Sequence, residues 1–143
     1  MEIHPQLLRD CHHLGRLGSG ALLLHRNASL PWFILVPDTD LADVLDLPEA
    51  QRADVLADSA RVSRFIKEYL ACPKLNFAGL GNQVPQMHLH LVGRRPGGAC
   101  WPQPVWGNLP DGGAYSIGQL QEWTRELVGR CQLEAATTAQ ENE

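Results

Sequence analysis

One short segment, Gln86–Val92, constrains the fold of this chain more than any other part of its sequence. Polar and apolar side chains alternate along it, and this period of two predicts a β-strand whose apolar face lies in the core. The opposite face carries Gln86, His88 and His90, so two imidazoles and an amide project together from a sheet. The chain therefore has to build a sheet that is apolar on one side and offers polar groups on the other.

Short apolar runs bounded by turn residues predict two β-hairpins. The first hairpin pairs residues 21–25 with residues 32–36 across a turn that ends at Pro31. The second pairs residues 75–80 with residues 86–94, so that it includes the histidine segment. Strands that follow one another in hairpins predict an antiparallel sheet.

Two helices are expected between and after these hairpins. Apolar residues keep helical spacing over 48–71, and Ser116 with Gln119 resembles a capping box at the start of a C-terminal helix. The pattern predicts an α+β fold, an antiparallel sheet of two hairpins with one long helix and a C-terminal helix. We expect a single domain over residues 1–132 and a disordered tail over residues 133–143, which carry few large apolar groups.

The N-terminal part of the chain has a weaker pattern. Residues 5–13 predict a short helix with Pro5 at its first position and with His12 and His13 on its surface. Three glycines then interrupt any periodicity, namely Gly15, Gly18 and Gly20. The first strand is therefore expected to begin at residue 21.

Composition excludes several classes of protein. With 143 residues, 44% of them hydrophobic and 20% charged, the chain has the size and make-up of one globular domain. Acidic residues outnumber basic ones by 16 to 12, and the net charge of −4 disfavours binding to a nucleic-acid polymer. The longest apolar runs are far shorter than the roughly 20 residues that span a bilayer, so no membrane partner is expected.

The cysteines and the N-terminus predict a cytoplasmic protein. The four cysteines lie far apart, with no Cys-x-x-Cys pair and therefore no zinc site of the cysteine type. The N-terminus lacks the basic region and apolar stretch of a signal peptide. Both features favour a reducing compartment over secretion.

The two histidines of the 86–92 segment allow three interpretations. Because imidazole titrates near neutral pH, one histidine can act as a neutral nucleophile while the other donates a proton, which suits attack on phosphorus. A His-x-His pair on a strand can also hold a metal ion, if His25 or His4 supplies a third ligand. In the third interpretation both histidines are solvent-facing strand residues without a chemical role. The spacing by itself leaves all three open.

The same segment resembles a family motif. Gln86-Met87-His88-Leu89-His90-Leu91-Val92 is similar to the histidine triad (HIT) motif His-φ-His-φ-His-φ-φ, in which φ is apolar. The resemblance extends to Asn76, to the Gly81-Asn82-Gln83 loop and to Gly93-Arg94, which fall where HIT proteins contact nucleotide and phosphate. Segments 31–37 and 101–107 resemble a bacterial branch of the family in particular. The resemblance implies a HIT-like fold.

The resemblance also implies a nucleotide hydrolase or transferase that needs no cofactor and no metal. The middle histidine of the motif attacks the α-phosphate of a small nucleotide, of the dinucleoside polyphosphate or nucleoside phosphoramidate type. A nucleotidyl-histidine intermediate forms, and this role falls on His88. His90 would bind a phosphate oxygen and help the leaving group to depart.

Five further positions are expected to bind substrate by the same resemblance: Asn76, Gln83, Gln86, His25 and Asn27. Gln86 departs from the family pattern, which has histidine there, because an amide forms hydrogen bonds but does not titrate. The departure leaves a second interpretation, a nucleotide-binding regulatory module with little turnover. Trp101 and Trp106 either stack on a base or pack on the core.

The family resemblance finally implies a homodimer whose sheets join side by side and whose long helices pack together. Phe65 lies beside the main apolar stripe of the expected helix, and it would widen the surface available for such packing.

Overall fold

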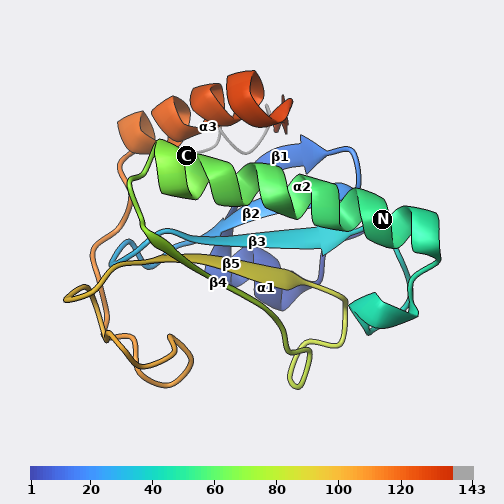
Figure 1. Cartoon of the computed structure of the whole chain (residues 1–143), viewed down its shortest axis with the longest axis horizontal. Helices are drawn as coiled ribbons and strands as arrows, with labels where there is room; N and C mark the ends of the chain where they lie inside the picture. The colour runs from blue at the N-terminus through green and yellow to red at the C-terminus, as the bar shows by residue number, and fades with distance from the viewer. Residues whose placement is uncertain (137–143) are drawn as a thin grey trace.

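The computed structural model describes residues 1–136, which form one antiparallel sheet flanked by helices (Figure 1). The sheet order is β4-β5-β3-β2-β1-β6. The strands are β1 Cys11–Leu17, β2 Gly20–His25, β3 Trp32–Pro37, β4 Lys74–Gly79, β5 Leu89–Arg94 and β6 Glu134–Ala135. The helices are α1 Pro5–Asp10, α2 Glu49–Glu68 and α3 Ile117–Cys131, and the 3₁₀ turn η1 spans Val44–Asp46. The expected α+β class and antiparallel sheet are confirmed.

Both expected hairpins are present and lie next to each other. β2 pairs with β3, and β4 pairs with β5. β3 and β5 then pair, which places His90 opposite Ile34 on one side and opposite Ala78 on the other. Because β5 has a hydrogen-bonded neighbour on each side, the backbone that carries His90 is held firmly in place.

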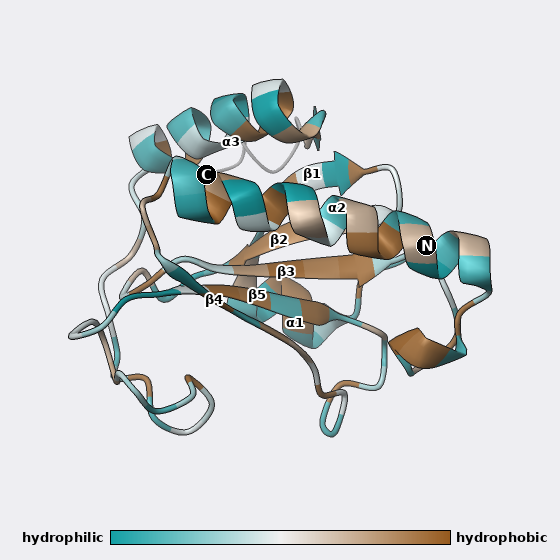
Figure 2. Ribbon diagram, in the orientation of Figure 1, coloured by the Kyte–Doolittle hydropathy of each residue, from teal (hydrophilic) through white to brown (hydrophobic). Residues whose placement is uncertain are grey.

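Helices cover one face of the sheet, which we call the helical face. In Figure 1, α2 and α3 lie on this side and α1 lies on the other. Phe33, Leu89 and Leu91 pack on the helical face within one apolar cluster that includes residues of both helices. Figure 2 shows the hydrophobic character of β3, whose residues are all buried because both faces of the sheet are covered there.

We call the opposite side of the sheet the cavity face. A second apolar cluster lies there, and it includes Leu7 of α1, Ile34 of β3 and Val105 of the long loop after β5. Only one short helix and a loop cover the cavity face, so space remains there. On the helical face two long helices fill the corresponding space.

The long helix and the C-terminal helix match the expectation in their main features. α2 buries Val55, Val62 and Ile66, and α3 begins with the expected capping box. Phe65 is also buried, and its ring lies at right angles to that of Phe33. It therefore belongs to the core, and the expectation that it widens an outer apolar surface of the helix is wrong. Within residues 1–136, no helix combines the length and the apolar character needed to cross a membrane.

The N-terminal part of the chain corrects the expectation. α1 ends at Asp10, and His12 and His13 lie on β1 rather than on a helix surface. The pairing of β1 with β2 shifts register between His13 and Gly15, and this irregularity interrupts the alternation by which a strand is recognised in a sequence. At Gly15 any side chain would collide with the carbonyl oxygen of Glu134, so glycine is what lets β6 approach β1.

The C-terminal part also needs a correction. Leu133 is buried, and Glu134–Ala135 pair with β1 as strand β6, so the chain continues into the sheet beyond residue 132. Two strand residues carry too little sequence pattern to be recognised, and their pairing depends on β1. The rest of the expected tail, residues 137–143, lies outside the described residues.

Candidate functional site

A cavity of about 710 Å³ opens on the cavity face beside both motif histidines. Its walls come from α1, from β3 and β5, and from the loops before and after β5. Five of the predicted site residues line it together: His25, Asn27, Gln83, His88 and His90. The volume lies in the range of small-molecule sites, and it suits a ligand of nucleotide size.

The ring of His88 is oriented by the main chain. His88 is buried, and its Nδ1 lies 2.7 Å from the carbonyl oxygen of Gln86. A carbonyl oxygen can only accept, so Nδ1 carries the hydrogen, and the neutral ring keeps its lone pair on Nε2. This tautomer presents a nucleophilic nitrogen.

The ring of His90 is held in the opposite tautomer. Trp32 Nε1–H donates to His90 Nδ1 at 3.0 Å, so the hydrogen of the neutral ring lies on Nε2. Burial, together with the neighbouring His88 and His25, lowers the pKa of His90 to about 4. At neutral pH His90 is therefore an uncharged hydrogen-bond donor.

The two motif rings lie edge to face, with centroids 5.0 Å apart and planes at 72°. Trp106 approaches His90 in the same manner, with centroids 5.1 Å apart. The aromatic neighbours hold the His90 ring and shield it from water. One cavity thus contains a nitrogen that can attack phosphorus and an N–H that can bind one of its oxygens.

His25 and Asn27 enter the cavity from the end of β2. The His25 ring stacks on Trp32 with centroids 4.3 Å apart, and its Nδ1 accepts from the main-chain N–H of Asn27 at 3.2 Å. Burial lowers the pKa of His25, so it too is a neutral donor through Nε2. The Asn27 amide donates to the Pro110 carbonyl at 2.9 Å, which ties the long loop to this wall.

Asn76 does not line this cavity. Its Oδ1 accepts from Arg94 Nη1 at 2.9 Å, and Nη2 of the same guanidinium donates to the Gln103 carbonyl at 2.8 Å. Arg94 is only 3% exposed, and its guanidinium carbon lies over the ring of Trp101, 5.6 Å from the ring centroid. The structure therefore places Asn76 and Arg94 in the anchoring of the loop after β5.

Gln86 does not line the cavity either, although we expected it to share a strand face with the histidines. β5 begins at Leu89, so the alternation of a strand does not extend back to Gln86. Its Oε1 accepts from the main-chain N–H of His4 at 2.7 Å, and its Nε2 donates to the Glu2 carbonyl at 2.9 Å. The side chain thus binds the N-terminal segment.

Three residues around the site were not assigned to it from the sequence. Trp32 orients His90, yet in the sequence it is one apolar residue of a strand, with no signal of a polar role. His4 and Asp10 line the cavity from α1 and its N-cap, and His4 was considered there only as a metal ligand. Polar residues on a short helix carry no periodic signal that points to a site.

The metal interpretation gains no third ligand from the structure. Among residues 1–136, no three His, Cys, Asp or Glu side chains group in a way that could hold a metal ion. The Nδ1 atoms of His88 and His90 are both engaged in the hydrogen bonds described above.

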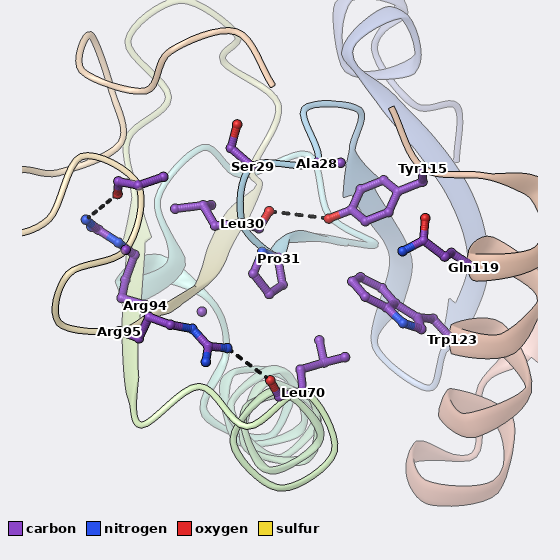
Figure 3. Close-up of a pocket in the computed structure, with 13 residues that line it drawn as sticks. Ala28, Ser29, Leu30, Pro31, Leu70, Arg94, Arg95, Tyr115, Gln119 and Trp123 are labelled. Carbon is purple, nitrogen blue, oxygen red and sulfur yellow. Dashed lines mark hydrogen bonds between the residues drawn. The ribbon is translucent and has the colours of Figure 1, made fainter. Parts of the chain in front are cut away.

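A second cavity, of about 300 Å³, lies near the start of β3 and the end of β5 (Figure 3). Its polar groups are satisfied by the protein. Tyr115 Oη donates to the Leu30 carbonyl at 3.3 Å, and Arg95 Nη2 donates to the Leu70 carbonyl at 3.3 Å. Gly93 and Arg94 line it, but neither motif histidine does, so the candidate site is the larger cavity.

Comparison with known proteins defines the class to which this fold and site belong. A family model described as the HIT domain matches residues 9–97, so the chain belongs to the HIT family. The expected resemblance is confirmed. Membership makes the chain a protein of the nucleotide-binding and nucleotide-hydrolase type.

Solved structures agree with this assignment over nearly the whole chain. A histidine triad protein of Bradyrhizobium japonicum is 37% identical, with a TM-score of 0.84, and the match covers 91% of this chain and 97% of that one. One from Marinobacter aquaeolei VT8 is 35% identical, with a TM-score of 0.84 and coverage of 93% and 98%. One from Sinorhizobium meliloti 1021 is 28% identical, with a TM-score of 0.83 and coverage of 90% and 96%. A search of curated proteins finds no significant match.

Proposed function

We propose that this HIT protein cleaves a small nucleotide at its α-phosphate, with His88 as the nucleophile and His90 as a hydrogen-bond donor to the phosphate. The observation that carries the proposal is the pair of hydrogen bonds that assign opposite tautomers to the two rings beside one cavity. His88 has its lone pair on Nε2, whereas His90 has its hydrogen there. The substrate class is a dinucleoside polyphosphate or a nucleoside phosphoramidate.

In the first step, the lone pair of His88 Nε2 forms a bond to the α-phosphorus. The P–O or P–N bond to the leaving group breaks, and the leaving group takes that electron pair and a proton from solvent. Since His88 keeps the hydrogen on Nδ1, the nucleotidyl-imidazole carries a positive charge. The Gln86 carbonyl, 2.7 Å from Nδ1, stabilises that charge.

In the second step, water attacks the same phosphorus and the N–P bond breaks. The electron pair returns to His88 Nε2, the water loses a proton to solvent, and a nucleoside monophosphate leaves. In both steps the Nε2–H of His90 donates to a phosphate oxygen as negative charge accumulates there. Because the pKa of His90 is about 4, the ring is uncharged at neutral pH, and its Nε2–H remains available as a donor.

The rest of the cavity supports the binding of a nucleoside. Leu7, Val105 and Trp106 give it an apolar and aromatic part, which suits a base. His25 adds a neutral donor on the same side as Trp32. The apolar part and the histidine pair belong to one continuous space, as a nucleotide requires.

The test is incubation of the protein with diadenosine tetraphosphate and with adenosine phosphoramidate, followed by detection of AMP. We expect AMP release that is insensitive to a chelator. Rapid denaturation during turnover should trap a protein heavier by one adenylyl group, and a His88→Ala variant should show no such adduct. Tight binding of AMP without any release would instead identify a regulatory module. Loss of activity with the chelator would point to a metal-dependent hydrolase.

We further propose that the protein is a homodimer. β4 is an edge strand of the described sheet, and Phe77 on it and Leu80 just after it are 44% and 46% exposed. Large apolar side chains beside unpaired strand edges favour association with another sheet. A sedimentation mass close to that of one chain at micromolar concentration would contradict this proposal.

A further inference from the structure

One wall of the nucleotide cavity is formed by the beginning of the chain. His4, Gln6, Leu7 and Asp10 line the cavity, and we call residues 1–10 the N-terminal wall. Its helix, α1, has six residues. A helix of this length is not stable by itself in water, because so few hydrogen bonds do not offset the cost of its first turn. The wall therefore depends on contacts with the rest of the protein.

Several contacts hold the N-terminal wall. The main-chain N–H of Arg26 donates to the Asp10 carbonyl at 2.9 Å, and Arg26 Nε donates to the Arg9 carbonyl at 3.1 Å. Leu7 is 4% exposed and packs in the apolar cluster of the cavity face. The His4 ring caps α1, because its Nδ1 accepts from the main-chain N–H of Gln6 at 3.0 Å. The Gln86 amide binds the segment just before the helix, at 2.7 Å from the His4 nitrogen and 2.9 Å from the Glu2 oxygen.

The Gln86 contact requires a primary amide. The side chain accepts from one main-chain group and donates to another two residues away, and it does so with two atoms that share one carbon. The two nitrogens of an imidazole point in divergent directions and do not match this arrangement. The contact thus gives a structural reason for glutamine at the first motif position.

The same residue also touches the nucleophile. The main-chain carbonyl of Gln86 accepts from Nδ1 of His88, while its side chain holds the N-terminal wall. Gln86 therefore connects the wall of the cavity with the ring that attacks the substrate. The main-chain contact persists in any substitution of the side chain, so the two contacts can be separated by mutation.

We propose that Gln86 is a positioning residue whose amide anchors the N-terminal wall and thereby sets the affinity of the cavity for nucleotide. The inference on affinity rests on the proposed function, whereas the anchoring of residues 1–10 is independent of it. Because the amide is neutral and lies outside the cavity, its loss changes binding and leaves the chemical step and its pH profile unchanged.

The test compares Gln86→Ala with the wild type and with Gln51→Ala. Gln51 is a matched control, because its amide also donates to a main-chain carbonyl, that of Asp38 at 2.8 Å, and does not line the nucleotide cavity. For Gln86→Ala we expect faster hydrogen exchange at residues 1–10 and a KM and an AMP dissociation constant raised about tenfold, as the loss of one to two neutral hydrogen bonds predicts. We expect kcat to stay within about threefold of the wild type.

Gln86→Glu is a second variant, in case the alanine variant does not fold. It keeps an acceptor for the His4 N–H but places a carboxylate oxygen against the Glu2 carbonyl, where no donor remains, so we expect a change of the same kind. Unchanged exchange at residues 1–10 in both variants would overturn the anchoring. A lower kcat or a shifted pH profile with an unchanged KM would overturn the role in affinity. Failure of the wild type to bind AMP would overturn the proposed function, while the exchange measurement would still decide the anchoring.

Discussion

The helical face and the cavity face of the sheet are built from alternate residues of the same strands. Leu89 and Leu91 point to the helical face, where each is at most 1% exposed and packs against apolar neighbours. His90, between them in sequence, points to the cavity face, where one hydrogen bond from Trp32 determines the position of its proton. On the helical face the stabilising energy is spread over many packing contacts. On the cavity face the proposed function depends on individual hydrogen bonds.

The comparison predicts that substitutions on the two faces have different consequences. On the helical face they should lower the free energy of unfolding and leave the proposed activity of the folded protein unchanged. On the cavity face they should lower activity and have a smaller effect on stability. Three substitutions test this separation, and a fourth, at His90, tests how the cavity face makes stability depend on pH.

His88→Ala should have the largest effect. It removes the nucleophile of the proposed reaction, which no neighbour can replace, so we expect kcat to fall by about 10⁴-fold. The free energy of unfolding should change by less than about 2 kcal/mol, because a single buried polar side chain is lost and no apolar core position. Turnover assays and chemical denaturation of the same preparation would check both values. A folded variant with near-normal turnover would remove His88 from the mechanism.

Leu91→Ala is the counterpart on the helical face. Leu91 is fully buried, and truncation of such a side chain leaves a cavity in a packed core. We expect the free energy of unfolding to fall by about 3 kcal/mol, with kcat of the folded protein within about threefold of the wild type. Denaturant titration and assays well below the unfolding midpoint would measure the two quantities. A large loss of kcat without a loss of stability would break the separation of the faces.

His90→Asn should change how stability depends on pH. The pKa of His90 is lowered from 6.5 to about 4, so between these values the unfolded chain binds a proton that the folded protein does not. This residue therefore makes the protein less stable as the pH falls from 6.5 to 4. Asparagine does not titrate. Between pH 6.5 and pH 4 the free energy of unfolding of the variant should therefore fall by up to about 3 kcal/mol less than that of the wild type. Denaturation curves of both proteins at several pH values would show it, and parallel pH profiles would contradict it.

Trp32→Phe should have the smallest of the four effects. Phenylalanine keeps an aromatic ring beside His25 but removes the N–H that donates to His90 Nδ1. The hydrogen of His90 can then move to Nδ1, where it cannot serve the substrate, and we expect kcat to fall about tenfold, as for one lost hydrogen bond. Steady-state kinetics would measure the change. A kcat equal to that of the wild type would show that the Trp32 hydrogen bond does not select the tautomer.

Local physical chemistry allowed much of the fold to be predicted from the sequence. Alternation over Leu89–Val92, helical spacing in α2 and the Ser116 capping box each depend on residues within one or two turns or strand steps. Alternation extended back to Gln86 correctly placed His88 and His90 beside one cavity but wrongly placed Gln86 there. Local signals were too weak at β1, where the register shifts near Gly15, and at β6, which has two residues.

The tertiary structure decided which atoms of the site are donors and which are acceptors. Trp32 and His90 are 58 residues apart in sequence, and Gln86 is 84 residues from Glu2, so no local pattern relates them. Hydrogen bonds between such distant groups determine the tautomer of His90 and turn Gln86 toward the N-terminal wall. Residue types and their spacing along a strand are properties of the sequence, whereas the position of a proton on a buried ring depends on whichever distant group the fold brings beside it.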